Sequence, residues 1–206
     1  MFPFSRTILD FLFPPFCVGC GKDSAWLCEA CLSSIPLLEI EPDQVALSPY
    51  SHPTTRKIVT NLKYQSATCL IEAVESLLER YRKEQGVPVW SGTIVSVPAS
   101  EKRLRERGVD QAALIADVLK KVWFPQSERK NLLARTKHTL PNAKLEDERA
   151  RQGNVSQAFV CSVKRVAGSV ILVDDVYTTG ATMNECARVL REAGATDVKF
   201  FTVAKG

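Results

Sequence analysis

The stretch VILVDDVYTTGATMNE, at residues 170–185, brings together groups that can bind a phosphate and groups that can bind a sugar. Four apolar residues precede Asp174 and Asp175, which predicts a buried strand with two acids at its carboxyl end, where open parallel sheets bind ligands. A loop then leads into a helix start, where backbone N–H groups and the helix dipole attract an anion. The phosphate-binding residues that we expect in this loop are Thr178, Thr179, Gly180, Ala181 and Thr182.

The two acids restrict the kind of ligand that fits this stretch. Asp174 and Asp175 would repel a simple anion, but they would accept hydrogen bonds from sugar hydroxyls. A ribose 5-phosphate group, with a phosphate at one end and vicinal hydroxyls at the other, suits both halves. The chain contains neither a G-x-x-x-x-G-K-[ST] loop nor a G-x-G-x-x-G loop. The alternative is a strand–turn–helix unit in which the two acids only cap the turn.

A basic cluster follows a second predicted buried strand, at residues 93–98. Its members, Lys102, Arg103, Arg105 and Arg107, are opposite in charge to a pyrophosphate and are our candidate pyrophosphate ligands. The alternative is a solvated basic helix start. Residues 101–151 hold 13 Lys and Arg against 8 Asp and Glu, so the modest net charge of +4 gathers in the middle of the chain.

Four of the seven cysteines form a Cys-x₂-Cys-x₇-Cys-x₂-Cys pattern at Cys17, Cys20, Cys28 and Cys31. Two such pairs can surround Zn²⁺ with four thiolates, and Gly19 and Gly21 would let the first pair turn tightly. A disulfide or a redox Cys-x-x-Cys pair is the alternative. A disulfide conflicts with a reducing cytosol, which we expect because the apolar N-terminus is interrupted by Arg6 and Asp10 and lacks a signal-peptide pattern.

Hydrophobic periodicity predicts how the remaining residues position these groups. We expect short strands at 46–50 and 93–98, buried strands at 169–175 and 197–204, and amphipathic helices at 54–64, 67–84, 109–123 and 182–195. Apolar strands that alternate with helices imply a largely parallel sheet covered on both faces. We expect residues 1–40 to form a small zinc-ribbon-like module and residues 41–206 the α/β domain, with Phe2, Phe4, Phe11, Phe13 and Phe16 packing the module on the domain. No apolar run is long enough to span a membrane.

The motif VILVDDVYTTGAT resembles the phosphoribosyl pyrophosphate (PRPP) signature of type I phosphoribosyltransferases. With the cysteine pattern, LKY at 62–64, RGVDQ at 107–111 and the segment 133–159, the chain resembles the ComF (GntX-like) family over nearly its full length. The segment shares with that family the residues Arg135, Thr139, Leu145, Arg149, Asn154 and Phe159. The chain departs from the family pattern at Asp110, where Asn is usual, and at Asn142, where Gln is common.

The resemblance implies a type I phosphoribosyltransferase-like fold, PRPP as the ligand, and Mg²⁺ with the pyrophosphate at the basic loop. It further implies that Asp174 and Asp175 orient the ribose during catalysis. Three functions follow: a PRPP-binding competence factor that handles single-stranded DNA with other competence proteins, an active phosphoribosyltransferase acting on a nitrogenous base, and a PRPP-responsive regulator. A cytoplasmic location is expected for all three.

Overall fold

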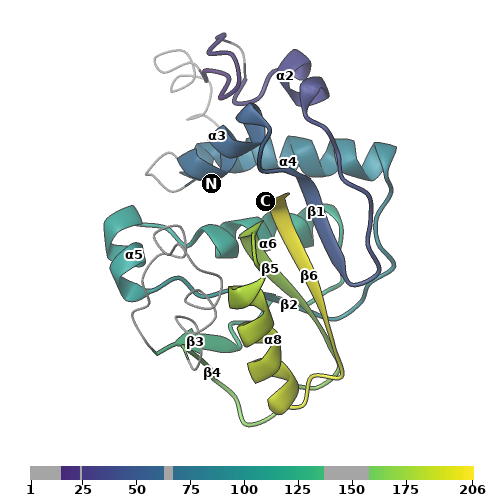
Figure 1. Ribbon diagram of the computed structural model, residues 1–206, viewed down its shortest axis with the longest axis vertical. Coiled ribbons are helices and arrows are strands. Elements are labelled where there is room, and N and C mark those ends of the chain that lie inside the picture. Colours follow the sequence, from purple (N-terminus) through teal and green to yellow (C-terminus); the bar gives the residue numbers. More distant parts are fainter. Residues whose placement is uncertain (1–14, 24, 63–66, 137–157) are drawn as a thin grey trace, which may run out of the picture.

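The computed structural model describes residues 15–23, 25–62, 67–136 and 158–206, and its core is a four-stranded parallel sheet (Figure 1). The strands are β1 (Gln44–Pro49), β2 (Thr93–Ser96), β5 (Ser169–Tyr177) and β6 (Asp197–Lys205), in the order β1-β6-β5-β2. Parallel pairing throughout brings all four carboxyl ends to one edge. The strands, their direction and their approximate positions agree with the sequence-based prediction.

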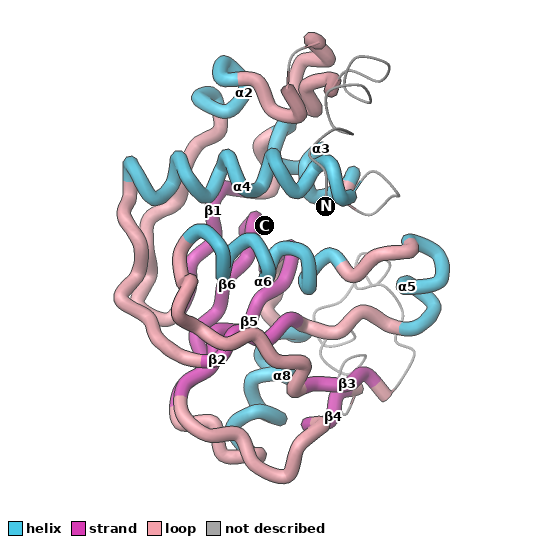
Figure 2. The backbone as a smooth tube through the Cα atoms, turned by 180° about the vertical axis from the view of Figure 1, so that it is seen from behind, coloured by secondary structure: helices cyan, strands magenta, loops and turns pink. Residues whose placement is uncertain are grey.

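Helices cover both faces of this sheet. One face packs against α3 (Pro53–Asn61), α4 (Ala67–Glu84) and α6 (Gln111–Val122), and Figure 2 shows α4 and α6 lying side by side. The other face packs against α8 (Ala181–Glu192) and a two-stranded antiparallel sheet of β3 (Leu133–Arg135) and β4 (Phe159–Cys161). The fully buried Ala73, Val74, Leu77 and Leu78 of α4 follow the i, i+3, i+4 spacing that predicted this helix.

Some elements differ from the prediction. Strand β5 ends at Tyr177, two residues beyond the predicted end at Asp175, and β3 and β4 were not predicted. The basic cluster forms its own short helix, α5 (Glu101–Arg107), which Ser100 caps by accepting a hydrogen bond from the Arg103 N–H group at 3.3 Å.

The cysteine-rich segment packs directly on the sheet domain. Its helix α2 (Glu29–Ser34) and the following turn are held by Arg80 of α4, whose Nη1 donates to the carbonyl oxygens of Leu32 and, at 2.7 Å, of Ile35. Cys17, Leu27 and Ile35 are buried in the same apolar cluster as β1 and α4. The two parts therefore share one core, and the domain boundary at residue 40 remains a prediction from the sequence.

The phenylalanine prediction is wrong at Phe16, which is 56% exposed, while Phe2, Phe4, Phe11 and Phe13 lie outside the described residues. The backbone of Phe16 pairs in an antiparallel bridge with that of Asp23. Among the helices described, none combines the length and the apolar character needed to cross a membrane.

We predict that Arg80→Met destabilises the protein by about 2 kcal/mol, because two carbonyl oxygens at the α2 turn lose their donor. Arg82→Met is the matched control, since the exposed Arg82 pairs with Glu79 across one helix turn, and it should change stability by less than about 0.5 kcal/mol. Urea unfolding of the three proteins measures both values. Equal effects would show that Arg80 does not anchor the cysteine-rich segment.

Candidate functional site

Asp174 and Asp175 lie near the carboxyl end of β5, at the carboxyl edge of the sheet. The N–H group of Asp175 donates to Asp174 Oδ1 at 2.9 Å, and that of Val176 donates to Asp175 Oδ1 at 2.8 Å. Because successive side chains of a strand leave opposite faces, Asp174 starts on the same α8 face as Leu172. Both residues are partly exposed, although the carboxyl group of Asp174 itself is buried.

The surroundings of Asp174 oppose its ionisation. Burial of its carboxyl group and the neighbouring charge of Asp175 raise the pKa of Asp174 well above its ordinary value, against smaller opposing effects of the Asp175 N–H group and the Arg103 guanidinium. A group that brings hydrogen-bond donors or positive charge to this carboxyl would favour its ionised form. The site therefore favours a ligand that brings hydrogen-bond donors or positive charge to the Asp174 carboxyl.

Arg135 is a member of this charged group that lay outside our candidate set. Burial and the charge of Arg103 lower the pKa of Arg135, whereas the charge of Asp174 raises it, so the three side chains act on one another. Its guanidinium lies 5.1 Å from the centroid of the Phe159 ring, which joins the end of β3 to β4. The sequence had singled out Arg135 as one of the residues of segment 133–159 that resemble the ComF family, without assigning it a role.

The loop that follows β5 turns into α8 at Gly180. Gly180 is the N-cap of α8 with φ of 74°, and a Cβ atom there would lie 2.3 Å from the hydroxyl oxygen of Tyr177. Thr179 Oγ1 accepts a long 3.5 Å hydrogen bond from the Ala181 N–H group, while Thr178 is exposed. Thr182 lies in the first turn of α8, so the five predicted residues form one continuous strand–loop–helix junction.

The structure divides the four basic residues of α5 into two pairs. Lys102 and Arg105 are exposed and form long ion pairs with Glu106 and Glu101, at 3.8 and 3.9 Å. Arg103 and Arg107 are partly buried: Arg103 acts on the pKa of Asp174, and Arg107 Nη1 donates to Gln111 Oε1 at 3.0 Å. Only the second pair is directed toward the body of the protein.

Asp110, the departure from the family pattern, has a structural role at the start of α6. It is the N-cap of this helix, and its Oδ1 accepts a hydrogen bond from the Ala113 N–H group at 3.1 Å. The carboxylate therefore stabilises the helix end as an asparagine at this position would.

The four clustered cysteines form a site with the dimensions of a zinc centre. All four Sγ atoms lie within 4.8 Å of one another, and those of Cys20 and Cys28 are 3.7 Å apart. A tetrahedral centre with Zn–S bonds of about 2.3 Å has its sulfur atoms about 3.8 Å apart. A Cβ atom at Gly19 would lie 2.6 Å from Cys31 Sγ, so this glycine lets the two Cys-x-x-Cys pairs close on each other.

The thiols also differ in how readily they ionise. Burial disfavours the Cys17 thiolate, but the N–H groups of Cys28, Cys20 and Gly19 outweigh it and lower the pKa of Cys17 to about 6. Burial and the neighbouring thiols raise the pKa of Cys31 to about 12. Hydrogen bonds from backbone N–H groups to sulfur are the usual support of structural zinc sites.

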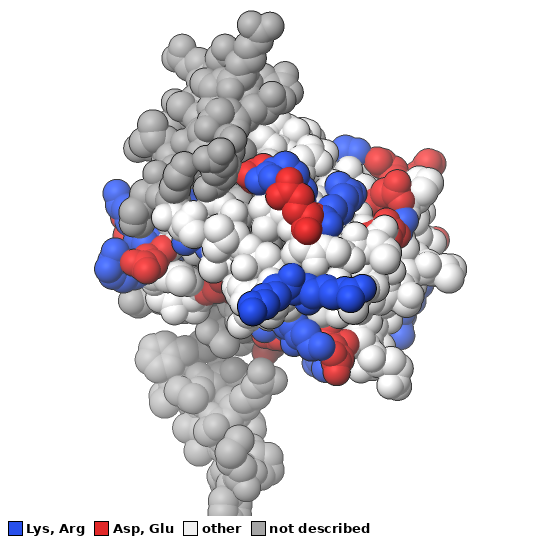
Figure 3. All heavy atoms as spheres, turned by 90° about the horizontal axis from the view of Figure 1, so that it is seen from below, with Lys and Arg blue, Asp and Glu red and all other residues white. Residues whose placement is uncertain are grey.

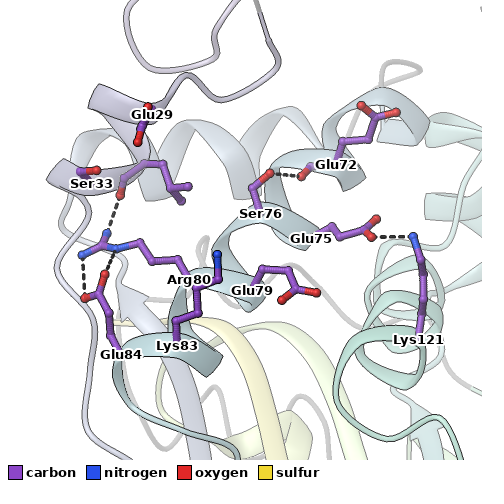
Figure 4. A pocket seen from close by; sticks show the side chains of 11 residues that line it. Glu29, Ser33, Glu72, Glu75, Ser76, Glu79, Arg80, Lys83, Glu84 and Lys121 are labelled. Atoms are coloured by element: carbon purple, nitrogen blue, oxygen red, sulfur yellow. Dashed lines mark hydrogen bonds and ion pairs between the residues drawn. The ribbon is translucent and has the colours of Figure 1, made fainter.

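A separate groove, not lined by either of the two acids, lies between α2, α4 and α6 (Figure 4). Its volume is about 690 Å³, and Glu75 and Lys121 form an ion pair across it. Arg80 and Glu84 pair at 2.7 Å along its wall. Glu29, Glu72, Glu79 and Lys83 also line this seam between the three helices.

We predict that the purified protein contains about one zinc ion per chain and that Cys28→Ser lowers this content severalfold. Since the cluster adjoins the common core, removal of the metal should lower the midpoint of thermal unfolding by about 5 °C or more, equivalent to about 2 kcal/mol for a chain of this size. Metal analysis under anaerobic conditions and thermal denaturation with a chelator measure these effects. Cys161→Ser is the matched control, because this free cysteine lies outside the cluster, and an equal loss of zinc in both variants would contradict the assignment.

Comparisons with known proteins agree with this architecture. A phosphoribosyl transferase domain matches residues 150–206, which include β5, the loop and α8. Competence protein F of Haemophilus influenzae is 27% identical over 197 residues, covering 93% of this chain and 85% of that protein. The DNA utilization protein YhgH of Escherichia coli K12 is 28% identical over 198 residues, covering 92% and 83%.

Among solved structures, adenine phosphoribosyltransferase of Leishmania donovani matches with a TM-score of 0.36 at 15% identity, covering 82% of this chain and 86% of that one. So distant a likeness has no bearing on the substrate. The parallel sheet flanked by helices, together with the matched domain, gives the type I phosphoribosyltransferase-like fold that the signature predicted. The chain is a homologue of competence protein F and YhgH that carries a phosphoribosyl transferase domain, which confirms the resemblance to the ComF family.

Proposed function

We propose that this protein binds PRPP at the carboxyl edge of its sheet and serves in the handling of DNA taken up by the cell. The observation that carries the proposal is the junction of β5 and α8, where two partly exposed acids adjoin a glycine-capped helix start. This junction offers acceptors for sugar hydroxyls and N–H donors for a phosphate within one short segment.

In this proposal each part of the junction binds one part of the ligand. The 5-phosphate lies in the loop 178–182, and the ribose hydroxyls donate to the carboxylates of Asp174 and Asp175. The diphosphate extends toward α5, where Arg103 and Arg107 are the two cations directed inward. Mg²⁺ bound with PRPP would neutralise part of the diphosphate charge.

The role in DNA uptake rests on the names of the relatives, a competence protein and a DNA utilization protein. The exposed Lys102 and Arg105 of α5 are suitable contacts for the backbone of single-stranded DNA. The face shown in Figure 3 carries acidic and basic side chains interspersed, which favours a local contact over a broad electrostatic surface on that side.

A second candidate function is transfer of the ribose 5-phosphate group from PRPP to a nitrogenous base. The matched phosphoribosyl transferase domain and the two acids favour it. The bond between C1 of the ribose and the diphosphate would break through an oxocarbenium-like transition state, while Asp174 and Asp175 orient the sugar. Release of pyrophosphate from PRPP across a panel of bases distinguishes an enzyme from a binding protein, and dependence of partner binding on PRPP would identify a regulator.

We predict that the wild-type protein binds PRPP in the presence of Mg²⁺ and that the double variant Asp174→Asn/Asp175→Asn binds it about 100-fold or more weakly. Two hydrogen bonds to charged acceptors, each contributing about 1.5–3 kcal/mol, are lost. Isothermal titration calorimetry measures this difference. Asp43→Asn, an exposed acid at the opposite edge of the sheet, is the control and should bind as the wild type does.

The same titration should release protons. Because the pKa of Asp174 is raised in the free protein and ribose hydroxyls favour the ionised carboxylate, binding lowers this pKa and becomes tighter as the pH rises toward it. Titrations in buffers of different ionisation enthalpy count the released protons. Equal affinity of the wild type and the double variant would refute the proposed site.

We further predict that the double variant Lys102→Glu/Arg105→Glu retains less single-stranded DNA. Loss of two phosphate contacts should reduce the slope of the logarithm of the binding constant against that of the salt concentration by about 1.4. The control Arg82→Glu/Lys83→Glu makes the same change of charge at the exposed end of α4. If both double variants bind DNA equally, α5 is not the contact surface.

A further inference from the structure

A second pocket lies at the opposite edge of the sheet from the two acids. Its volume is about 480 Å³, and it is lined by residues at the amino ends of β2 and β5, among them Gly92, Gly168 and Ser169, and by the residues that follow α6. Ser169 begins β5 and precedes Asp174 by five residues, so at about 3.3 Å per residue the two positions are about 17 Å apart along the strand. The pocket is therefore separate from the proposed PRPP site.

Three aromatic side chains line this pocket, those of Trp90, Trp123 and Phe124. Trp90 is partly exposed, while Trp123 and Phe124 are each 7% exposed, with their rings edge-to-face at a centroid distance of 6.3 Å. The indole N–H group of Trp90 donates to the Pro42 carbonyl oxygen at 3.1 Å, and that of Trp123 donates to the Leu78 carbonyl oxygen at 3.2 Å. Since these bonds occupy both N–H groups and fix both indoles, the tryptophans offer a ligand aromatic surface only.

The polar side chains of the pocket carry mainly hydroxyl groups, those of Ser91, Thr93, Ser127 and Ser169. Within the described part of the chain, none of these hydroxyls bonds to another residue, and each can donate or accept a hydrogen bond. The one charged side chain among the lining residues is that of Glu128, which pairs with Lys130 at 2.5 Å. This lining suits a flat, uncharged ligand with donors and acceptors on its edge.

We propose that this pocket binds a nucleobase, which stacks on Trp90 and exchanges hydrogen bonds with the surrounding hydroxyls. A nucleobase is flat, carries no charge at neutral pH and has donors and acceptors on its edge. Stacking of a base on an aromatic side chain contributes about 1–3 kcal/mol. The inference concerns a site of its own and does not depend on PRPP binding at the carboxyl edge.

The base can come from a free nucleoside or from single-stranded DNA. Lys164 and Arg165 are exposed on the segment that leads to the pocket, where they suit the phosphates of a strand. Figure 3 looks onto this edge of the molecule and shows Lys and Arg side chains beside uncharged surface.

Quenching of tryptophan fluorescence tests the proposal, because a base stacked on an indole quenches its emission. The chain has three tryptophans, and Trp26 does not line the pocket, so Trp26→Leu is the matched control for Trp90→Leu. We expect adenosine and thymidine to quench the emission of the wild type and of Trp26→Leu. Trp90→Leu should bind labelled adenosine about 10-fold or more weakly in equilibrium dialysis. Equal affinity of the two variants would overturn the assignment.

Ala167→Trp tests the pocket without removing any of its aromatic side chains. Ala167 is exposed and lines the pocket, so an added indole occupies space that the base needs. Adenosine affinity should fall about 10-fold, while the midpoint of thermal unfolding should stay within about 2 °C of that of the wild type. Ser162→Trp adds the same side chain at an exposed position that does not line the pocket, and it should bind adenosine as the wild type does. Unchanged affinity in Ala167→Trp would contradict the proposal.

Two further ligands identify the source and the kind of ring. Oligothymidylate that binds more tightly than thymidine, and less tightly to Lys164→Glu/Arg165→Glu, would assign the pocket to single-stranded DNA, whereas equal affinities would assign it to a free nucleoside. N-acetylphenylalanine amide has a ring without donors or acceptors and should bind about 10-fold more weakly than thymidine. Equal binding of these two compounds would show a general aromatic pocket and refute the assignment to a nucleobase.

Saturating PRPP separates this inference from the proposed function. Adenosine binding should be the same with and without PRPP, and displacement of adenosine would place the base at the carboxyl edge and overturn the inference. Adenosine binding by protein that fails to bind PRPP would support this inference and refute the proposed function.

Discussion

The pairing of β5 between β2 and β6 is the constraint on which the rest of the structure depends. Val170, Ile171, Leu172 and Val173 are fully buried, and alternate members face the α6 side and the α8 side. A strand that is apolar on both faces needs cover on both sides, as in a parallel sheet between two layers of helices. Its continuation carries Asp174 and Asp175 past the core to the edge of the sheet, so the stability of the core and the position of the acids follow from one segment.

The cysteine-rich segment extends this core and does not form a separate body beside it. Tyr81 of α4 is fully buried, and its hydroxyl donates to the Leu38 carbonyl oxygen at 2.7 Å in the chain that links the two parts. Lys57 of α3 donates to the Gly19 carbonyl oxygen at 2.8 Å. A thiol cluster attached in this way on two sides cannot move independently of the helices that cover the sheet.

The sequence predicted the parts of the site that depend on local pattern. The run from Val170 to Thr182 contains the strand, the turn and the helix start in sequence order, and the structure has these three elements in the same order. Relations between distant residues were not accessible in this way. That Arg103 and Arg135 act on Asp174, and that Arg107 bonds to Gln111, depends on packing of four elements. Hydrophobic periodicity does not report side-chain direction in a polar segment such as α5.

The contact between Gly180 and Tyr177 has a consequence for how the protein can evolve. The tyrosine hydroxyl occupies the space that any larger side chain at position 180 would need, and the Tyr177 ring lies 6.3 Å from that of Phe200 in the neighbouring strand. A larger residue at position 180 therefore needs a shift of the Tyr177 side chain and also a left-handed backbone that L side chains rarely adopt. A smaller residue at position 177 would relieve the first constraint and leave the second, so the backbone conformation is what restricts position 180 to glycine.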